Sequence, residues 1–244
     1  MTLLEAQGIT KRFGGLVAVD SLDIHVEQGE IVGLIGPNGA GKTTAFNLIS
    51  GFMQPTAGEV YFQGKNITGL RPDQVCKLGL ARTFQVVKPF AQLSVGENIM
   101  VGAYNRTNSK QEARENTEEI VQFLGLEDVS GEPAGSLSVA YRKRLELAKT
   151  LATGPEIILL DEGMAGLRPK ETDEIIELVR QVSQRGISLL IVEHVMKVIM
   201  TLAERIVVIH HGKKLAEGTP KEITSNPEVI DAYLGEEDVY VESE

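Results

Sequence analysis

Apolar residues along the chain follow two spacings that predict β-strands. Leu22, Ile24 and Val26 alternate with polar residues, which is the period-two pattern of a strand with one buried face. Other apolar residues form short continuous runs, typical of buried strands, at residues 31–35 and 157–160, and further strands are predicted at residues 188–192 and 205–210. The same reasoning predicts strands near the start of the chain, at residues 60–62 and at residues 213–217.

Helices are predicted between these strands. Residues 138–152 place Leu145, Ala148 and Leu151 on one stripe, as in an amphipathic helix. Further helices are predicted at residues 41–50, 112–124, 169–184 and 195–202, and near 93–101. Because strands alternate with helices, we expect a largely parallel sheet covered on both faces. Residues 72–153 show no clear strand, which predicts a helical insertion in a larger α/β domain.

Composition and charge exclude several classes of protein. The chain has 244 residues, a net charge of −10 and one cysteine. The acidic balance argues against general binding to a nucleic-acid backbone, and a lone Cys76 excludes an internal disulfide framework and most zinc sites. No apolar run approaches the ~20 residues that span a bilayer, and Glu5 interrupts the opening segment where a signal peptide stays apolar. Residues 236–244 form an acidic tail that we expect to be solvated.

A glycine-rich loop carries the strongest chemical signal. It fits G-x-x-x-x-G-K-[ST], follows a predicted buried strand, precedes a predicted helix and consists of Gly36, Pro37, Asn38, Gly39, Ala40, Gly41, Lys42, Thr43 and Thr44. The N–H groups of such a loop point at an anion, and the helix N-terminus adds its positive dipole end. Lys42 would reach the β- and γ-phosphates, and the Thr43 hydroxyl would hold Mg²⁺. The alternative is a glycine-rich turn that binds no ligand.

Two acidic residues end a later strand. Asp161 and Glu162 follow the apolar run at residues 157–160. Ligands of parallel sheets bind outside the carboxyl ends of the strands, so Asp161 is expected to hold Mg²⁺ and Glu162 to polarise an attacking water. His194 ends another strand and is a candidate to contact the γ-phosphate. The alternatives are two solvated acids and a hydrogen-bonded structural histidine.

These motifs, in this order, resemble the ATP-binding cassette of ABC transporters over nearly the whole chain. The resemblance implies an α/β P-loop NTPase core with an N-terminal antiparallel β subdomain and a helical signature subdomain at about residues 86–153, all within one domain. It implies that Phe13, 23 residues before Gly36, stacks on adenine, with a core aromatic as the alternative. It also implies that Gln85 acts in catalysis and holds magnesium, and that Ser138 binds nucleotide. Lys42, Glu162 and His194 match the family's catalytic positions.

Shorter sequence segments resemble one subgroup of this family, the first of the two different ATPases of branched-chain amino-acid importers. Arg82-Thr83-Phe84-Gln85, Ala165-Gly166-Leu167 and the ending from Glu217 carry this resemblance. It implies an ATP-hydrolysing importer subunit at the cytoplasmic face of the plasma membrane. The implied partners are a second cassette bound head to tail, permease subunits and, indirectly, an extracytoplasmic binding protein. A lipopolysaccharide-type exporter ATPase and a weakly hydrolysing regulatory cassette are the alternatives.

Two segments of the chain depart from the family pattern. Val139 and Ala140 stand where the signature has glycines, and Arg168 stands where an Asp or Asn is expected. We therefore hypothesise that, in a heterodimer, the composite site that uses this signature turns over slowly. The basic run at residues 142–144 either compensates in part for the missing glycines or is a solvated face, and we favour the solvated face. Residues 86–90 are expected to contact the permease, or else to pack inside the insertion.

Overall fold

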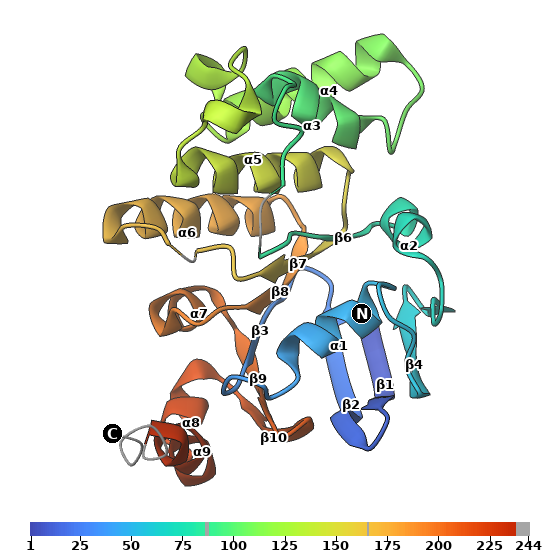
Figure 1. Cartoon of the computed structure of the whole chain (residues 1–244), viewed down its shortest axis with the longest axis vertical. Coiled ribbons are helices and arrows are strands. Elements are labelled where there is room, and N and C mark those ends of the chain that lie inside the picture. The colour runs from blue at the N-terminus through green and yellow to red at the C-terminus, as the bar shows by residue number, and fades with distance from the viewer. Residues whose placement is uncertain (86–87, 165, 238–244) are drawn as a thin grey trace. The chain divides into compact units, whose positions relative to one another are not determined.

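The computed structural model describes residues 1–85, 88–164 and 166–237. They form two units, one made of Met1–Pro72 and the segment from Ser188 onward, and the other of Asp73–Ile187. The elements of each are labelled in Figure 1. No helix in the described part of the chain combines the length and apolar character needed to cross a lipid bilayer.

The first unit contains an antiparallel sheet with strand order β2-β1-β4-β5, formed by β1 (Thr2–Phe13), β2 (Leu16–Glu27), β4 (Ala57–Phe62) and β5 (Lys65–Asn66). Leu22, Ile24 and Val26 are buried while the residues between them are exposed, which confirms the predicted alternation. Strands β1 and β2 run farther toward their shared turn than the predicted strands do. The last residues of β1, Arg12 and Phe13, are exposed, so no apolar period marks them in the sequence.

The same unit holds four strands in the order β10-β9-β3-β8, formed by β3 (Ile31–Ile35), β8 (Ser188–Val192), β9 (Arg205–His210) and β10 (Lys213–Gly218). Strand β3 is parallel to β8 and β9, and β10 is antiparallel to β9. Every residue of β3 is buried, as its continuous apolar run predicted, and every residue of β8 is buried as well. The helices of this unit are α1 (Lys42–Ile49), α7 (Met196–Leu202), α8 (Pro220–Thr224) and α9 (Pro227–Glu237).

The second unit is mainly helical. Its helices are α3 (Val95–Ala103), α4 (Lys110–Phe123), α5 (Val139–Ala152) and α6 (Pro169–Gln184), with α2 (Pro72–Leu78) at its start. Helices α3 and α4 pack against α5 and against each other (Figure 1). The predicted helix at residues 169–184 is confirmed with both of its ends, and α5 begins one residue after the predicted start because Ser138 is its N-cap.

The expectation that residues 72–153 contain no strand is wrong. Strand β6 (Leu80–Arg82) pairs in parallel with β7 (Ile157–Asp161). Three residues are too few to show an apolar period, and the partner strand lies more than 70 residues later in the chain. The strand is therefore defined by its long-range pairing, which local sequence does not record.

Candidate functional site

The glycine-rich loop connects β3 to α1 in the first unit (Figure 1). Gly41 precedes the first helical residue with φ of +108°, and no side chain caps this end of α1. The first turn also carries no acidic residue. An anionic ligand at the positive dipole end of α1 would therefore meet neither a capping side chain nor a first-turn carboxylate.

Two glycines of the loop are required by packing as well as by backbone conformation. A Cβ on Gly36 would lie 2.1 Å from the carbonyl oxygen of Ile209, and one on Gly41 would lie 2.5 Å from the carbonyl oxygen of Ala18. Both distances are far below van der Waals contact with main-chain atoms that cannot easily move. The loop is thus seated directly against β9 and β2, and only glycine permits that approach.

A hairpin turn is hydrogen-bonded to the loop. Gly212, between β9 and β10, donates its N–H to the carbonyl oxygen of Ala40 (2.9 Å), and its own carbonyl accepts from the N–H of Asp20 (2.8 Å). Its φ is +78°, and a Cβ there would lie 2.9 Å from the carbonyl oxygen of Ala18. Sequence reasoning missed this residue, since a glycine in a hairpin turn is ordinary until the turn is seen to contact the loop.

Lys42 curls back over the loop. Its Nζ atom donates to the carbonyl oxygens of Gly36 (2.5 Å) and Pro37 (2.8 Å), and the residue is only 6% exposed. The cationic group is therefore held within the loop, where an incoming phosphate would meet it. Among the other motif residues, Pro37 and Ala40 are buried, Thr44 is half-buried, and those exposed to solvent are Asn38, Gly39 and Thr43.

His194 follows β8 at the same edge of the sheet at which the glycine-rich loop follows β3. Gly33 of β3 pairs with Ile191 of β8 in a parallel register, so the chain reaches Gly36 and His194 three residues beyond that pair in each case. His194 is exposed, which suits a ligand contact. Phe13 ends β1 and is 46% exposed, so the core-aromatic alternative is wrong for it. The Nζ atom of Lys11 lies 5.5 Å from the centroid of its ring.

The acidic motif lies at the end of β7 in the second unit. Asp161 is 3% exposed, and its Oδ2 atom accepts a hydrogen bond from Nη2 of Arg82 at 2.7 Å. Its N–H donates to the hydroxyl of Thr83 (3.1 Å). The two side chains of the ion pair are 6% and 5% exposed, so the carboxylate is paired and not solvated. Arg82 was noticed in the sequence only as part of a family motif, and its ion pair with Asp161 was missed.

Gln85 and Glu162 are in direct contact. Nε2 of Gln85 donates to Oε2 of Glu162 at 2.5 Å. Glu162 has φ of +47°, an uncommon conformation for a residue with a side chain. Residues held in this region cost on the order of 1–3 kcal/mol and cluster at functional sites. The structure therefore brings together two predicted residues that lie 77 positions apart.

The basic run on α5 is not a solvated face. Arg142 and Lys143 donate to main-chain carbonyl oxygens, at 3.1 Å and 3.0 Å respectively, and Arg144 forms an ion pair with Glu174 at 2.6 Å. All three residues of the run are partly buried. The sequence interpretation failed because three consecutive basic residues on a helix point in different directions, each toward a different neighbouring segment.

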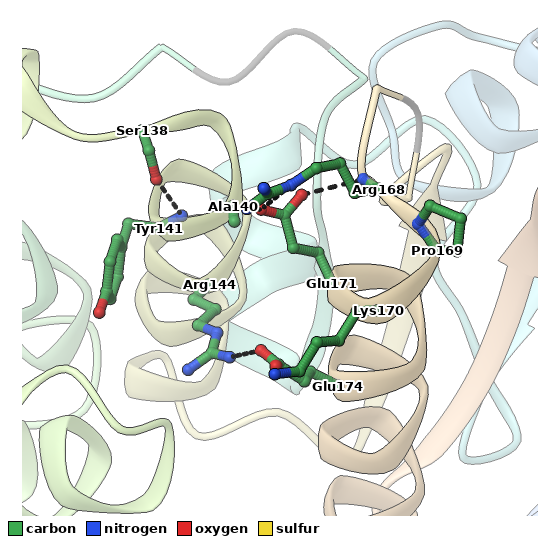
Figure 2. A pocket seen from close by; sticks show the side chains of 9 residues that line it. All are labelled: Ser138, Ala140, Tyr141, Arg144, Arg168, Pro169, Lys170, Glu171 and Glu174. Carbon is green, nitrogen blue, oxygen red and sulfur yellow. Dashed lines mark hydrogen bonds and ion pairs between the residues drawn. The ribbon is translucent and has the colours of Figure 1, made fainter.

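Ser138 lies at the rim of a cavity of about 680 Å³, lined by residues from the N-terminal ends of α5 and α6 (Figure 2). It is exposed, and its hydroxyl accepts from the N–H of Tyr141 (3.4 Å) as the N-cap of α5. The next residue, Val139, is 51% exposed. Across the cavity, the guanidinium of Arg168 bonds to the carboxylate of Glu171 at 2.5 Å and holds the pKa of that carboxyl below its ordinary value. Arg168 is thus directed back onto its own helix.

Apolar side chains are exposed just before and at the end of the segment expected to contact a permease, residues 86–90. Phe84 is 40% exposed and Phe90 is 51% exposed, so for Phe90 the alternative of packing inside the insertion is wrong. Asn98, which is fully buried, holds the main chain of Phe90 through bonds to its N–H (2.9 Å) and its carbonyl (3.1 Å). Val86, Val87 and Ala165, also named above, lie outside the described residues.

The described residues contain no group of three or more His, Cys, Asp or Glu side chains able to hold a metal ion. The predicted magnesium donors are one hydroxyl, one amide and one carboxylate, on Thr43, Gln85 and Asp161. Oxygen donors in this number suit Mg²⁺, which binds proteins through one or two carboxylates and completes its shell with phosphate oxygens and water.

Comparison with known proteins places these features in one family. A family model described as "ABC transporter" matches residues 19–165, and one described as "Branched-chain amino acid ATP-binding cassette transporter" matches residues 213–239. The chain is 40% identical to the high-affinity branched-chain amino acid transport ATP-binding protein BraF of Pseudomonas aeruginosa, over 96% of this chain and 98% of that one. It resembles the ADP conformation of an ATP-binding cassette of an ABC transporter, with a TM-score of 0.87 and 32% identity over 96% and 99% of the two chains. It also resembles a dimeric cassette bound to ADP and Pi, with a TM-score of 0.80 and 26% identity over 89% and 99%.

Proposed function

Because the chain belongs to the ABC transporter family of ATPases, we propose that it is the ATP-hydrolysing subunit of an importer for branched-chain amino acids or related amino-acid and amide solutes. The observation that carries the hydrolytic part is the contact between Gln85 and Glu162 directly after the buried Asp161. The choice of cargo is supported by the C-terminal match to the branched-chain amino acid family and by the name of the relative BraF.

Binding of ATP is assigned to the first unit. The amides of residues 36–44 and the ammonium group of Lys42 would hold the β- and γ-phosphates, and Lys42 would exchange its two loop carbonyls for phosphate oxygens. The N-terminus of α1 adds favourable electrostatics. Phe13, exposed at the end of β1, would stack on adenine, and His194 would contact the γ-phosphate.

Hydrolysis is assigned to residues of the second unit. Glu162 would orient the attacking water and accept its proton, which requires the carboxylate to turn from Gln85 toward the water. Thr43, Gln85 and Asp161 would hold Mg²⁺, which supplies positive charge against the phosphate oxygens. Such a reaction depends mainly on positioning and charge stabilisation, so rigid support of these residues matters more than covalent chemistry.

Assembly is proposed to follow the head-to-tail arrangement of two cassettes, and a dimeric cassette among the similar structures supports it. Ser138, at the N-terminus of α5, would then meet the γ-phosphate held by the second cassette. Permease subunits would dock at residues 86–90 on the helical subdomain, taken as residues 86–153, with an extracytoplasmic binding protein delivering cargo. The chain would work at the cytoplasmic face of the membrane, with residues 236–244 as a solvated tail.

A weakly hydrolysing regulatory cassette is the second candidate. It is favoured by Val139, whose branched side chain is half-exposed beside Ser138, where a partner's phosphate would have to approach closely. The two candidates differ in the turnover of the assembled complex, since a regulatory subunit would bind ATP without hydrolysing it.

Both candidates are tested with the complete complex in lipid vesicles. We expect Glu162→Gln to retain ATP and to abolish turnover, because the amide cannot accept the proton of water. Glu177→Gln on the exposed face of α6 is the matched control and should leave hydrolysis unchanged. Uptake of leucine, with lysine as the competing solute, tests the cargo. If Glu162→Gln left the steady-state rate of ATP hydrolysis unchanged, Glu162 would not be the residue that orients the attacking water.

A further inference from the structure

Lys143 reaches from α5 to the two residues assigned to hydrolysis. Its Nζ atom donates to the carbonyl oxygen of Glu162 at 3.0 Å and lies 3.5 Å from the carbonyl oxygen of Gln85. Its two basic neighbours on α5 make contacts elsewhere, with Gly135 and Glu174. Among the described residues of the basic run, Lys143 is therefore the one bonded to the acidic motif.

These hydrogen bonds link three residues, Lys143, Glu162 and Gln85, to one another. Lys143 holds the main chain of Glu162 and Gln85, while the side chains of Glu162 and Gln85 bond to each other at 2.5 Å. The three residues come from the end of β7, the segment after β6 and the helix α5. The ammonium group carries several donors and a full charge, so it can serve two carbonyl oxygens at once.

The carbonyl that Lys143 binds belongs to a residue with a strained backbone. Glu162 has φ of +47°, and such a conformation persists only where its surroundings hold it in place. A charged hydrogen bond to its carbonyl oxygen fixes the peptide plane that follows Glu162. The direction of the Glu162 side chain depends on that backbone, so a small shift there would move the carboxylate away from an attacking water.

We propose that Lys143 is a positioning residue for hydrolysis, which orients Glu162 and Gln85 through their main chains and ties them to α5. This inference rests on the proposed function, because it assumes that Glu162 orients the water. The N-cap of the same helix is Ser138, five residues earlier, where the second cassette's phosphate is proposed to bind.

The test compares Lys143→Met, which keeps the length of the side chain and removes its donors, with Lys143→Arg, which keeps charge and donors. In the assembled complex we expect Lys143→Met to lower kcat by about 10- to 100-fold, as for a small misplacement of catalytic groups, with little change in the KM for ATP. Lys143→Arg should recover much of the loss. Lys149→Met, on the same helix but paired with Glu146, is the matched control.

A second readout needs no transport. In the purified full chain, Lys143→Met should speed amide hydrogen exchange at residues 82–85 and 157–164, and Lys149→Met should not. Complexes of the unaltered chain that fail to hydrolyse ATP would contradict the proposed function, and the exchange data would then still decide whether Lys143 holds these segments. A normal kcat in Lys143→Met, an equal loss of kcat in Lys149→Met, or unchanged exchange would each overturn the inference.

Discussion

Removal of the buried cation beside Asp161 should destabilise the protein strongly. In Arg82→Met, the carboxylate of Asp161 loses its partner at 2.7 Å while the surrounding chain keeps it 3% exposed. Methionine retains much of the apolar stem of arginine, so the change mainly removes charge and donors. An unpaired charge in such a site must either remain poorly solvated or force the end of β7 to open.

The size of the effect follows from the burial of both partners. Their side chains are only 6% and 5% exposed, and removal of one member of a buried ion pair costs about 3–5 kcal/mol. For a chain of 244 residues this predicts a fall in Tm of about 6–20 °C. By contrast, Arg114 and Glu118 are 72% and 66% exposed, so Arg114→Met should cost well under about 1 kcal/mol.

Urea and thermal unfolding of four proteins measure the coupling: the unaltered chain, Arg82→Met, Asp161→Asn and the double variant. The double variant leaves no buried charge at this position, so its loss should be smaller than the sum of the two single losses. Arg114→Met serves as the surface control. A loss below about 1 kcal/mol for Arg82→Met, or additive losses in the double variant, would refute the reasoning that the ion pair is buried and coupled.

Three further predictions concern other parts of the chain. Gly212→Ala should weaken ATP binding to the purified chain about tenfold, because the added Cβ moves the turn that braces the phosphate loop; Gly186→Ala, which also has positive φ but open space, should leave affinity unchanged. Combined Val139→Gly and Ala140→Gly should raise the ATPase rate of the assembled complex, and an unchanged rate would contradict the idea of an impaired signature. Burial raises the pKa of the Cys76 thiol, so its alkylation at pH 7.5 should be slower than that of a small free thiol and should rise at higher pH; equal rates would show that the thiol is not shielded.

The elements with a strong local pattern were predictable from the sequence. The helix at residues 169–184 begins with a proline suited to its first turn and carries buried residues at helical spacing, and both of its ends agree with α6. The fully apolar runs became β3, β7 and β8. Strand β6 and helix α2 were not predicted, because each is short and β6 exists through its pairing with β7.

The residues of the candidate site also fall into a group that the sequence predicts and a group that it does not. The phosphate-loop motif predicts phosphate binding directly, because glycines, a lysine and a hydroxyl at this spacing between a strand and a helix suit few other purposes. The roles of Arg82, Lys143 and Gly212 were missed. Each is an ordinary residue type in an ordinary place, and each gains its role from a contact with a distant segment.

The sequence by itself determined the longer strands and helices, the phosphate loop and the residues able to carry the chemistry, because helix and strand periods and loop motifs involve only a few neighbouring residues. Only the tertiary structure decided which side chains support Asp161 and Glu162, and which glycines are required by packing. Those contacts join residues 19 to 173 positions apart. Their geometry depends on how the strands pair and the helices pack, and no local pattern of residue types records it.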